Sequence, residues 1–365
     1  MTTDSLFDSL AFKRGPAMKN RFMLAPLTNL QSHADGRLSD EEFKWLTMRA
    51  EGGFGLTMTC AAHVQAIGQG FPGQLGIFSD DHLEGLTRLA KKIRESESVS
   101  IVQLHHAGMR SPEELIGKKP VCPSDHEDPS ARALMLFEVE ALVEDFIRAA
   151  VRAEQAGFDG VELHGAHGYI LGQFFSAEIN QRSDRYGGTL ENRSRILFEI
   201  IDGIRTRCRA DFMLGVRLSP ERFGVTLPEA RELAQRVMAE GKVDFLDMSL
   251  WDVFKEPAEE EFKGRSLISY FAELDRGETR LGVAGKIYSA QAAQRCLASG
   301  VDFVLAGRAA ILHHDFPRRV HDDAAFRMAE TPVSRAYLAR EGLSEKFIDY
   351  MAGWAGFVED APVNA

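Results

Sequence analysis

The sequence predicts a protein of the α/β class and, more narrowly, a (β/α)8 (TIM) barrel. Three observations support this prediction: eight short apolar segments recur along the chain, amphipathic helical patterns separate them, and no linker rich in Pro, Gly or Ser divides the 365 residues. Eight alternating units in one undivided chain fit a closed parallel barrel better than an open doubly wound sheet. We expect a single domain over residues 1–365, with the barrel at about 20–315 and a C-terminal extension at about 316–365.

The expected strands are runs of apolar or β-branched residues bounded by turn residues. Several of the helical patterns between them end just before a glycine, as at Gly157, Gly241 and Gly300. An aspartate that opens the next strand follows each of these glycines, which marks a repeated βα unit. The strands are expected at Phe22–Ala25, Phe54–Thr59, Ser100–Leu104, Gly160–Leu163, Phe212–Arg217, Val243–Met248, Leu281–Ala284 and Asp302–Ala306. Helices are expected at Glu138–Ala156, Leu190–Cys208, Leu227–Glu240 and Ala290–Ser299.

The composition is that of a globular protein, with 44% hydrophobic and 27% charged residues and no apolar run long enough to cross a bilayer. The formal net charge of -11 disfavours non-specific binding to nucleic acid, so we expect a small-molecule partner and no membrane or nucleic-acid partner. The N-terminal residues lack the pattern of a secretory signal, and we therefore expect a cytoplasmic location.

The cysteines lie far apart and form no CxxC pair. Neither a disulfide framework nor a cysteine metal site is expected from this spacing. The four residues, Cys60, Cys122, Cys208 and Cys296, are therefore expected to be ordinary thiols.

Polar residues suited to catalysis recur where the expected strands end. In a barrel these ends, and the long loops that follow them at 61–81, 105–138 and 250–265, form the active-site face. The residues that follow or close strands in this way are Thr28, Gln103, His105, His164, His167, Arg217, Gly307 and Arg308. We therefore expect these side chains to meet in one site.

The loop His164–Tyr169 carries two histidines three residues apart and a tyrosine. A metal site is one interpretation, but no third ligand stands at a recognisable spacing and the glycines indicate a loop, so no metal is expected. A structural histidine pair is a second interpretation. The favoured one is catalytic, because two imidazole donors can hold a carbonyl oxygen that gains negative charge while Tyr169 supplies a proton.

Glycines after the seventh and eighth strands, at Gly285 and Gly307, are typical of phosphate binding in barrels, and Arg308 adds positive charge. Taken alone, these glycines could equally serve tight turns; together with the histidine–tyrosine loop, phosphate binding becomes the better interpretation. A further glycine run, Gly68–Gly73, matches GxGxxG. It neither follows a strand directly nor opens a helix, so we expect a loop near the site and no Rossmann unit.

The sequence resembles the Old Yellow Enzyme family of FMN-dependent NAD(P)H ene-reductases, over nearly the whole chain. Successive family motifs are matched, in order, by Asn20–Thr28, Gln103–Gly108, His164–Tyr169, Asn180–Gly188 and Ala306–Arg308. The spacing and the short chain most resemble the thermophilic-like, single-domain subclass. The resemblance implies FMN as cofactor, NADPH or NADH as hydride donor, and a homo-oligomer, either dimer or tetramer.

The resemblance also implies how each residue acts. Thr28 would lie near the O4 and N5 edge of the flavin, Gln103 would bind the pyrimidine part, and Arg217 would lie beside N1 and O2, where a cation favours the reduced anion. The phosphate would be held by Gly285, Gly307 and Arg308. The implied FMN-binding set is Ala25, Pro26, Leu27, Thr28, Ala62, His63, Gln103, Arg217, Gly285, Gly307 and Arg308.

The implied reaction has two halves. NAD(P)H gives a hydride to flavin N5; an α,β-unsaturated carbonyl or nitro compound then binds with its oxygen on His164 and His167. Hydride passes to the β-carbon, and Tyr169 protonates the α-carbon. The sequence departs from the thermophilic-like subclass at two positions, with Thr28 in place of Cys and Leu30 in place of Tyr.

Two alternatives remain at this point. A flavin-free phosphate-binding barrel lyase or isomerase would use His164 and Tyr169 as acid and base, but would leave Gln103 and Arg217 unexplained. A non-catalytic ligand-binding barrel is the other. The C-terminal aromatics Trp354 and Phe357 could pack on the barrel or on a neighbouring subunit, and the sequence does not decide between these.

Overall fold

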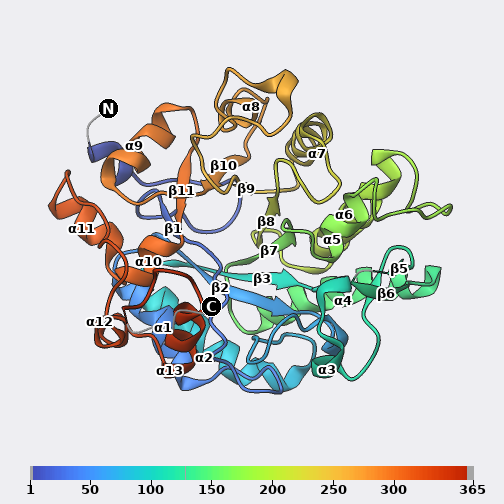
Figure 1. Ribbon diagram of the computed structural model, residues 1–365, viewed down its shortest axis with the longest axis horizontal. Helices are drawn as coiled ribbons and strands as arrows, with labels where there is room; N and C mark the ends of the chain where they lie inside the picture. Colours follow the sequence, from blue (N-terminus) through green and yellow to red (C-terminus); the bar gives the residue numbers. More distant parts are fainter. Residues whose placement is uncertain (1–2, 128, 360–365) are drawn as a thin grey trace.

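A computed structural model describes residues 3–127 and 129–359 and contains a closed barrel of eight parallel strands (Figure 1). The order around the barrel is β1-β11-β10-β9-β8-β7-β3-β2, so each strand neighbours the next barrel strand in the chain. All eight expected strands are present, and the predicted (β/α)8 fold is confirmed. The strands are β1 (Phe22–Leu24), β2 (Leu56–His63), β3 (Val99–His105), β7 (Gly160–Gly165), β8 (Met213–Leu218), β9 (Phe245–Ser249), β10 (Arg280–Ala284) and β11 (Phe303–Ala306).

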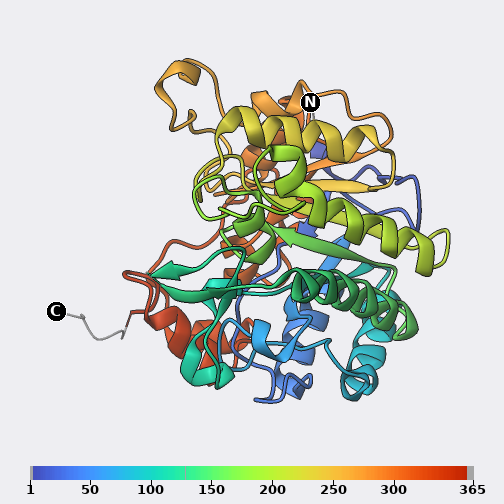
Figure 2. The ribbon, with the colours of Figure 1, turned by 90° about the vertical axis from the view of Figure 1, so that its right-hand side faces the viewer.

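Amphipathic helices surround the barrel and bury their apolar sides against the strands. Figure 2 shows the longest of them running side by side along the outside of the barrel. The helices between strands include α1 (Asp40–Glu51), α2 (Leu83–Glu95), α4 (Leu136–Gln155), α6 (Leu190–Arg207), α7 (Leu227–Ala239), α8 (Ser269–Ala272) and α9 (Ala290–Ala298), and α10 (Arg308–Leu312) follows the last strand. The four helices expected by residue range are confirmed to within two residues at each end.

The aspartate that recurs before strands has the same structural role each time. Its carboxylate accepts a hydrogen bond from the backbone N–H near the start of a neighbouring strand, which fixes the relative register of the two strands. The three bonds run from Ser100 N to Asp159 (2.9 Å), from Leu214 N to Asp244 (2.8 Å) and from Leu281 N to Asp302 (2.8 Å).

The barrel interior changes from apolar to polar along the strands, because inward side chains alternate with a period of two. Along β9, Phe245 lies deepest, followed by Asp247 and then Ser249 at the carboxyl end. Buried polar residues of four strands form what we call the charged layer: Gln103, Glu162, Arg217 and Asp247. The apolar floor below it includes Met23, Met58, Ile101, Met213, Phe245 and Phe303, and Leu10 and Met18 of the N-terminal segment pack in the same cluster.

The long connection after β3 is partly ordered into secondary structure that the sequence did not indicate. It contains α3 (Glu113–Ile116) and a small sheet of order β4-β6-β5, with β4 (Val121–Cys122), β5 (His126–Glu127) and β6 (Ser130–Ala133). Strands of two to four residues have no recognisable hydrophobic period. In Figure 2 this teal segment and the red C-terminal helices lie at the same end of the molecule.

The C-terminal extension packs on the barrel of its own chain. It contains α11 (Phe316–Asp322), α12 (Arg335–Arg340) and α13 (Glu345–Ala352), and Figure 1 places α12 and α13 beside α1. Phe347 of α13 meets Trp45 of α1 edge to face with ring centres 5.5 Å apart, and Ser344 N donates to Gln31 Oε1 at 3.0 Å. Because these contacts link the extension to the first βα unit, it closes over the β1 side of the barrel.

The four cysteines are free and buried. None of the helices described over residues 3–127 and 129–359 is long and apolar enough to span a membrane.

Candidate active site

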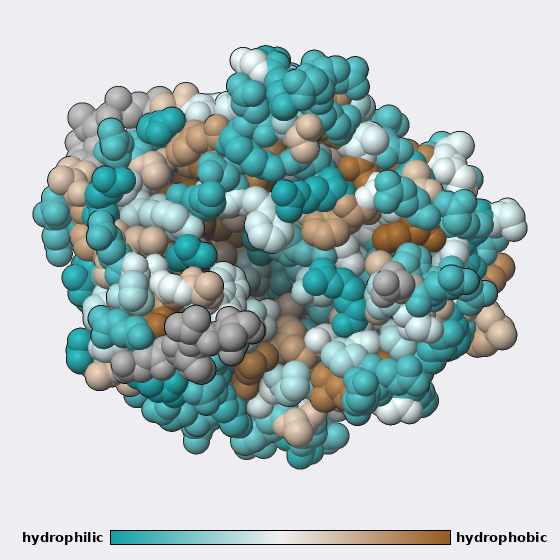
Figure 3. All heavy atoms as spheres, in the orientation of Figure 1, coloured by the Kyte–Doolittle hydropathy of each residue, from teal (hydrophilic) through white to brown (hydrophobic). Residues whose placement is uncertain are grey.

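The polar strand ends meet at the carboxyl end of the barrel, where Figure 3 shows the molecular surface hollowed near the centre of the face. His105 from β3 and His164 from β7 lie with ring centres 5.4 Å apart, and Tyr169 lies 4.3 Å from His105 and 5.1 Å from His164. His164 and His167, which we call the imidazole pair, have ring centres 5.0 Å apart. The structure therefore brings together the three residues expected to be catalytic.

The loop that carries the imidazole pair and Tyr169 is held by buried hydrogen bonds. Gln173 of α5 (Ile170–Phe175) donates to the carbonyl groups of Gly168 at 2.9 Å and Ala107 at 3.1 Å, which ties this loop to the one after β3. The His167 backbone has a left-handed φ of 60°, and its N–H donates to Ser219 Oγ at 2.9 Å. Arg110 donates to the His167 carbonyl at 2.6 Å.

Burial keeps the histidines of the site neutral. Desolvation, and secondarily the nearby His167 and His105, lower the pKa of His164 well below its usual value. Desolvation, with a smaller contribution from the charges of Arg217 and Arg110, lowers the pKa of His167 to about 3. Each imidazole therefore has one N–H to donate at neutral pH, and the pair can stabilise negative charge without itself being charged.

The charged layer lies directly below the imidazole pair along β7 and β9. Gln103 Nε2 donates to Glu162 Oε1 at 2.7 Å, and Arg217 Nε lies 2.9 Å from Asp247 Oδ2. The second contact is an ion pair by distance, although its angle does not make a hydrogen bond. Desolvation, and secondarily Asp247, raise the pKa of Glu162. Desolvation also raises that of Asp247, against the opposing effect of Arg217.

The segment Ala25–Thr28 follows β1 at the carboxyl end of the barrel. Ala25 N donates to the Ala306 carbonyl at 3.1 Å, which places this segment beside the end of β11. The continuation is anchored by the buried Glu42 of α1, whose carboxylate accepts from Asn29 Nδ2 at 3.0 Å. Pro26, Leu27 and Thr28 are half-buried.

Gly307 and Arg308 open α10 next to this segment. A Cβ on Gly307 would lie 3.5 Å from Leu27 and 3.8 Å from Ala25, so the glycine faces the segment after β1. The guanidinium group of Arg308 lies 5.8 Å from each of three ring centres, those of Tyr288, Trp354 and Phe357. Two of these rings belong to the C-terminal extension, which therefore orients the arginine expected at a phosphate.

Gly285 has a clear structural role of its own. Its φ is +150°, and a Cβ there would lie 2.8 Å from the Trp251 carbonyl carbon and 2.9 Å from Asp252 N. The close approach of the loop after β9 therefore requires glycine at this position whether or not the site holds a phosphate.

Ala62 and His63 close β2 beside β3, with Ala62 paired to Leu104 and His63 to His105. The backbone of His63 is engaged by the following segment: its N–H donates to Leu75 O at 3.0 Å, and its carbonyl accepts from Ile77 N at 3.1 Å. The run Gly68–Gly73 lies in the loop after β2 and packs against the loop after β3. A Cβ on Gly70 would lie 3.0 Å from Ala107 Cβ and 3.6 Å from His105 Cε1, as expected for a loop near the site.

Five residues of the site were not identified from the sequence: Arg110, Glu162, Gln173, Asp247 and Ser249. A signal existed for three of them, because Glu162, Asp247 and Ser249 are polar residues inside strands that should be apolar on both faces. Each of these three residues lies two positions along its strand from another side chain that points into the barrel. No comparable signal existed for Arg110 or Gln173, whose roles depend on how two loops meet.

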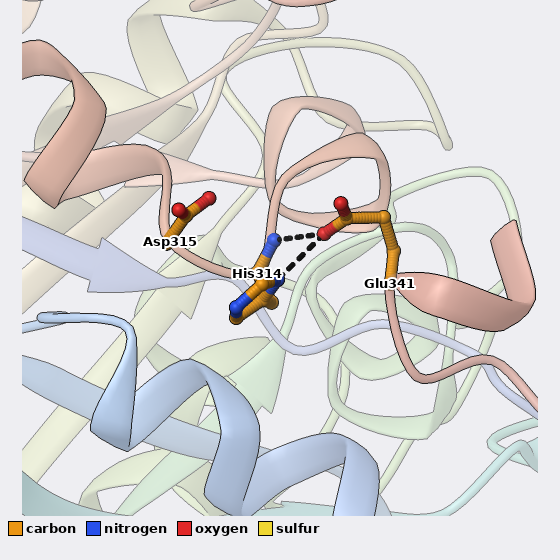
Figure 4. Close-up of side chains that lie close together, drawn as sticks. All are labelled: His314, Asp315 and Glu341. Carbon is orange, nitrogen blue, oxygen red and sulfur yellow. Dashed lines mark hydrogen bonds and ion pairs between the residues drawn. The ribbon is translucent and has the colours of Figure 1, made fainter. Parts of the chain in front are cut away.

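His314, Asp315 and Glu341 lie close enough together to be potential metal ligands (Figure 4), but each forms hydrogen bonds within the protein. Both the backbone N–H and Nδ1 of His314 lie within 2.8 Å of Glu341 Oε2. Asp315 accepts from Arg319 Nε at 2.7 Å. The cluster therefore anchors the C-terminal extension to the α10–α11 connection.

Comparisons with known proteins identify the family of this chain. Residues 5–325 match the NADH:flavin oxidoreductase / NADH oxidase family. The chain is 34% identical over 328 residues to the probable NADH-dependent flavin oxidoreductase YqiG of Bacillus subtilis, covering 87% of this chain and 88% of that protein. It is 32% identical over 323 residues to an NADPH dehydrogenase of Bacillus cytotoxicus, covering 86% of this chain and 91% of that one. Some relatives are longer: the chain spans 36% of the NADH:fumarate oxidoreductase of Klebsiella pneumoniae.

Solved structures show the same architecture. The Old Yellow Enzyme homologue from Zymomonas mobilis superimposes with a TM-score of 0.80 at 27% identity, over 95% of this chain and 99% of that one. Morphinone reductase in complex with tetrahydroNAD superimposes with a TM-score of 0.77 at 27% identity, over 94% and 97% of the two chains. A flavin-free lyase or isomerase is therefore set aside. The chain belongs to the NADH:flavin oxidoreductase / NADH oxidase family and is an FMN-dependent NAD(P)H oxidoreductase of the Old Yellow Enzyme type.

Proposed function

We propose that this enzyme reduces the activated carbon–carbon double bond of α,β-unsaturated carbonyl or nitro compounds. One observation carries the proposal: His164 Nε2 and His167 Nδ1, on two neutral imidazoles, converge to 3.3 Å beside Tyr169 in the open end of the barrel. An oxygen that gains negative charge during reduction would be stabilised there.

The residues present fit FMN. His105 Nε2 is buried and has no hydrogen-bond partner within the described part of the chain, so a polar group of a ligand can satisfy it. Gly307, which has no side chain, and the oriented Arg308 suit the phosphate, while Ala25, Pro26, Leu27 and Thr28 would line the ring together with Ala62 and His63. Gln103 and Arg217 would lie at its pyrimidine edge, and Gly285 would complete the phosphate loop. When bound, FMN supplies the hydride that it has received from NAD(P)H.

The chain supplies orientation and a proton. The imidazole pair would hold the carbonyl or nitro oxygen, which fixes the alkene relative to Tyr169. Tyr169 would protonate the α-carbon from its hydroxyl, because a phenol keeps its proton at neutral pH yet can pass it to a strongly basic carbanion. Arg110, with its guanidinium 4.8 Å from the centre of the Tyr169 ring, would help to fix that ring.

Absorbance spectroscopy of the purified holoenzyme tests this proposal. Under anaerobic conditions the flavin bands should bleach with NADPH or NADH and return on addition of 2-cyclohexenone. Return of the bands only with molecular oxygen, and with no enone or nitroalkene, would contradict the substrate class while leaving the flavin chemistry intact.

A further inference from the structure

A chain of hydrogen bonds connects the charged layer to the imidazole pair through Ser249. Arg217 Nη2 lies 3.2 Å from Ser249 Oγ, which in turn lies 2.7 Å from His167 Nε2. His167 Nδ1 then faces His164 Nε2 at 3.3 Å. Ser249 is buried at the end of β9, so its hydroxyl has a defined set of partners.

Groups that can only donate determine most proton positions along this series of hydrogen bonds. Ala166 N–H donates to His164 Nδ1 at 3.2 Å, so the single proton of this neutral imidazole is on Nε2. Arg217 can only donate, so Ser249 Oγ accepts from it and keeps its own hydrogen available. The tautomer of His167 is the one variable that remains.

The two tautomers of His167 have different consequences. With its proton on Nε2, His167 donates to Ser249 and accepts from His164, so both N–H groups of the pair are used inside the protein. When His167 carries its proton on Nδ1, its Nε2 accepts a hydrogen bond from Ser249. The N–H groups of His164 and His167 are then directed at the same point between the two rings. Only an acceptor between them satisfies the second arrangement, and an oxygen about 2.9 Å from each nitrogen completes a triangle with the observed 3.3 Å side.

We propose that Ser249 is a positioning residue whose hydroxyl reverses its hydrogen bond with His167 when the substrate oxygen enters. Ser249 accepts from Nε2–H in the free site and donates to Nε2 in the occupied one, so that His167 turns an N–H toward the oxygen. Nε2 gives up one proton and Nδ1 takes up one by exchange with bulk solvent, so the imidazole keeps one proton and the net charge is unchanged. This inference rests on the proposed function of the imidazole pair.

Arg217 favours this reversal. A hydroxyl that accepts from a guanidinium is polarised and becomes a stronger donor. Arg217 also forms an ion pair with Asp247, so its guanidinium group is held by Asp247 as well as by Ser249. The same cation that is proposed to lie beside the flavin thus acts, through Ser249, on the residues that would bind the substrate.

Nitrogen-15 NMR of histidine-labelled holoenzyme tests the tautomers directly, with His167→Gln used for assignment. In the free holoenzyme both His164 and His167 should carry the proton on Nε2. Addition of 4-nitrophenol, whose oxygen is the probe acceptor, should move the His167 proton to Nδ1 and leave His164 unchanged. A His167 tautomer that is the same with and without bound probe would overturn the proposal.

Two variants separate this role from a structural one. Ser249→Ala should retain FMN and thermal stability but bind 4-nitrophenol about tenfold more weakly, because one hydrogen bond of the pair is lost. Ser249→Thr keeps the hydroxyl and should bind as the wild type does. Equal affinity of Ser249→Ala and the wild type for 4-nitrophenol would refute this inference but not the proposed function. Failure of the wild type to bind 4-nitrophenol or reduce any enone would refute the proposed function, while the free-state tautomers would still test the Ser249–His167 bond.

Discussion

Gln103 Nε2 donates a 2.7 Å hydrogen bond to Glu162 Oε1 inside the barrel, where both side chains are buried. The second oxygen, Oε2, has no partner among the described residues, and Asp247 of the same layer is a second buried carboxyl group. Desolvation first, and Asp247 second, raise the pKa of Glu162 to about 8. A buried acid held neutral in this way makes stability depend on pH.

Glu162→Gln should remove part of that pH dependence. In the wild type the folded state binds more protons than the unfolded state between the ordinary pKa of 4.5 and about 8, so stability falls as pH rises through this window. The slope reaches at most about 1.4 kcal/mol per pH unit. Asp247, whose pKa is raised to about 6, contributes only to the lower part of the window.

Urea unfolding of the apoprotein between pH 6 and 8 is the measurement. Glu162→Gln should reduce the pH dependence of the free energy of unfolding. Glu114→Gln, a change at an exposed glutamate, should leave this dependence as in the wild type. The same slope in Glu162→Gln as in the wild type would show that Glu162 is ionised in the folded protein.

Asp247→Asn should raise the midpoint potential of bound FMN. The substitution removes the carboxylate 2.9 Å from Arg217 Nε and leaves the guanidinium charge less compensated at the position proposed for the pyrimidine edge of the flavin. An uncompensated cation stabilises the reduced anion, and a change of about 1.4 kcal/mol corresponds to about 30 mV for two electrons. Anaerobic titration against a reference dye measures the shift, and a lower potential in the variant would place Arg217 away from that edge.

Tyr169→Phe should separate the two half-reactions. Removing the hydroxyl leaves hydride transfer from NAD(P)H unaffected, but deprives the α-carbon of its acid, and general acid catalysis typically contributes 10²–10⁴-fold. Stopped-flow absorbance should show normal bleaching of the flavin and slow reoxidation by 2-cyclohexenone. Tyr270→Phe, which loses only a hydroxyl bonded to the Phe262 carbonyl, is the matched control. Equal slowing of both half-reactions in Tyr169→Phe would indicate that the tyrosine orients ligands and does not protonate them.

The sequence predicted the barrel and its strand ends because both follow from local patterns. The apolar runs mark the strands, and the aspartates at 159, 244 and 302 mark the starts of repeated units. His105, His164 and Arg217 stand at strand ends, so their convergence follows from the closure of the sheet. The position of Ser249 against His167, in contrast, depends on the left-handed backbone of His167 and its bond to Ser219, which no sequence period records. The contact between Arg308 and the C-terminal rings joins segments some fifty residues apart and was likewise not predictable.

Trp354→Ala should weaken the binding of FMN, because Trp354 contacts Arg308, which is proposed to bind the FMN phosphate. Trp354 is one of three rings whose centres lie 5.8 Å from the Arg308 guanidinium, and it is partly exposed, so its loss leaves no large cavity. A cation–π contact at an exposed site contributes about 0.5–1 kcal/mol, which corresponds to a two- to five-fold weaker affinity. Fluorescence titration of the apoprotein should show this loss for FMN and none for riboflavin, because riboflavin lacks the phosphate. Phe137→Ala, at an exposed ring in the first turn of α4, should change neither affinity. If Trp354→Ala weakens FMN and riboflavin equally, the C-terminal extension acts on the ring and not on Arg308, and the phosphate would have to be held without the help of the aromatic residues.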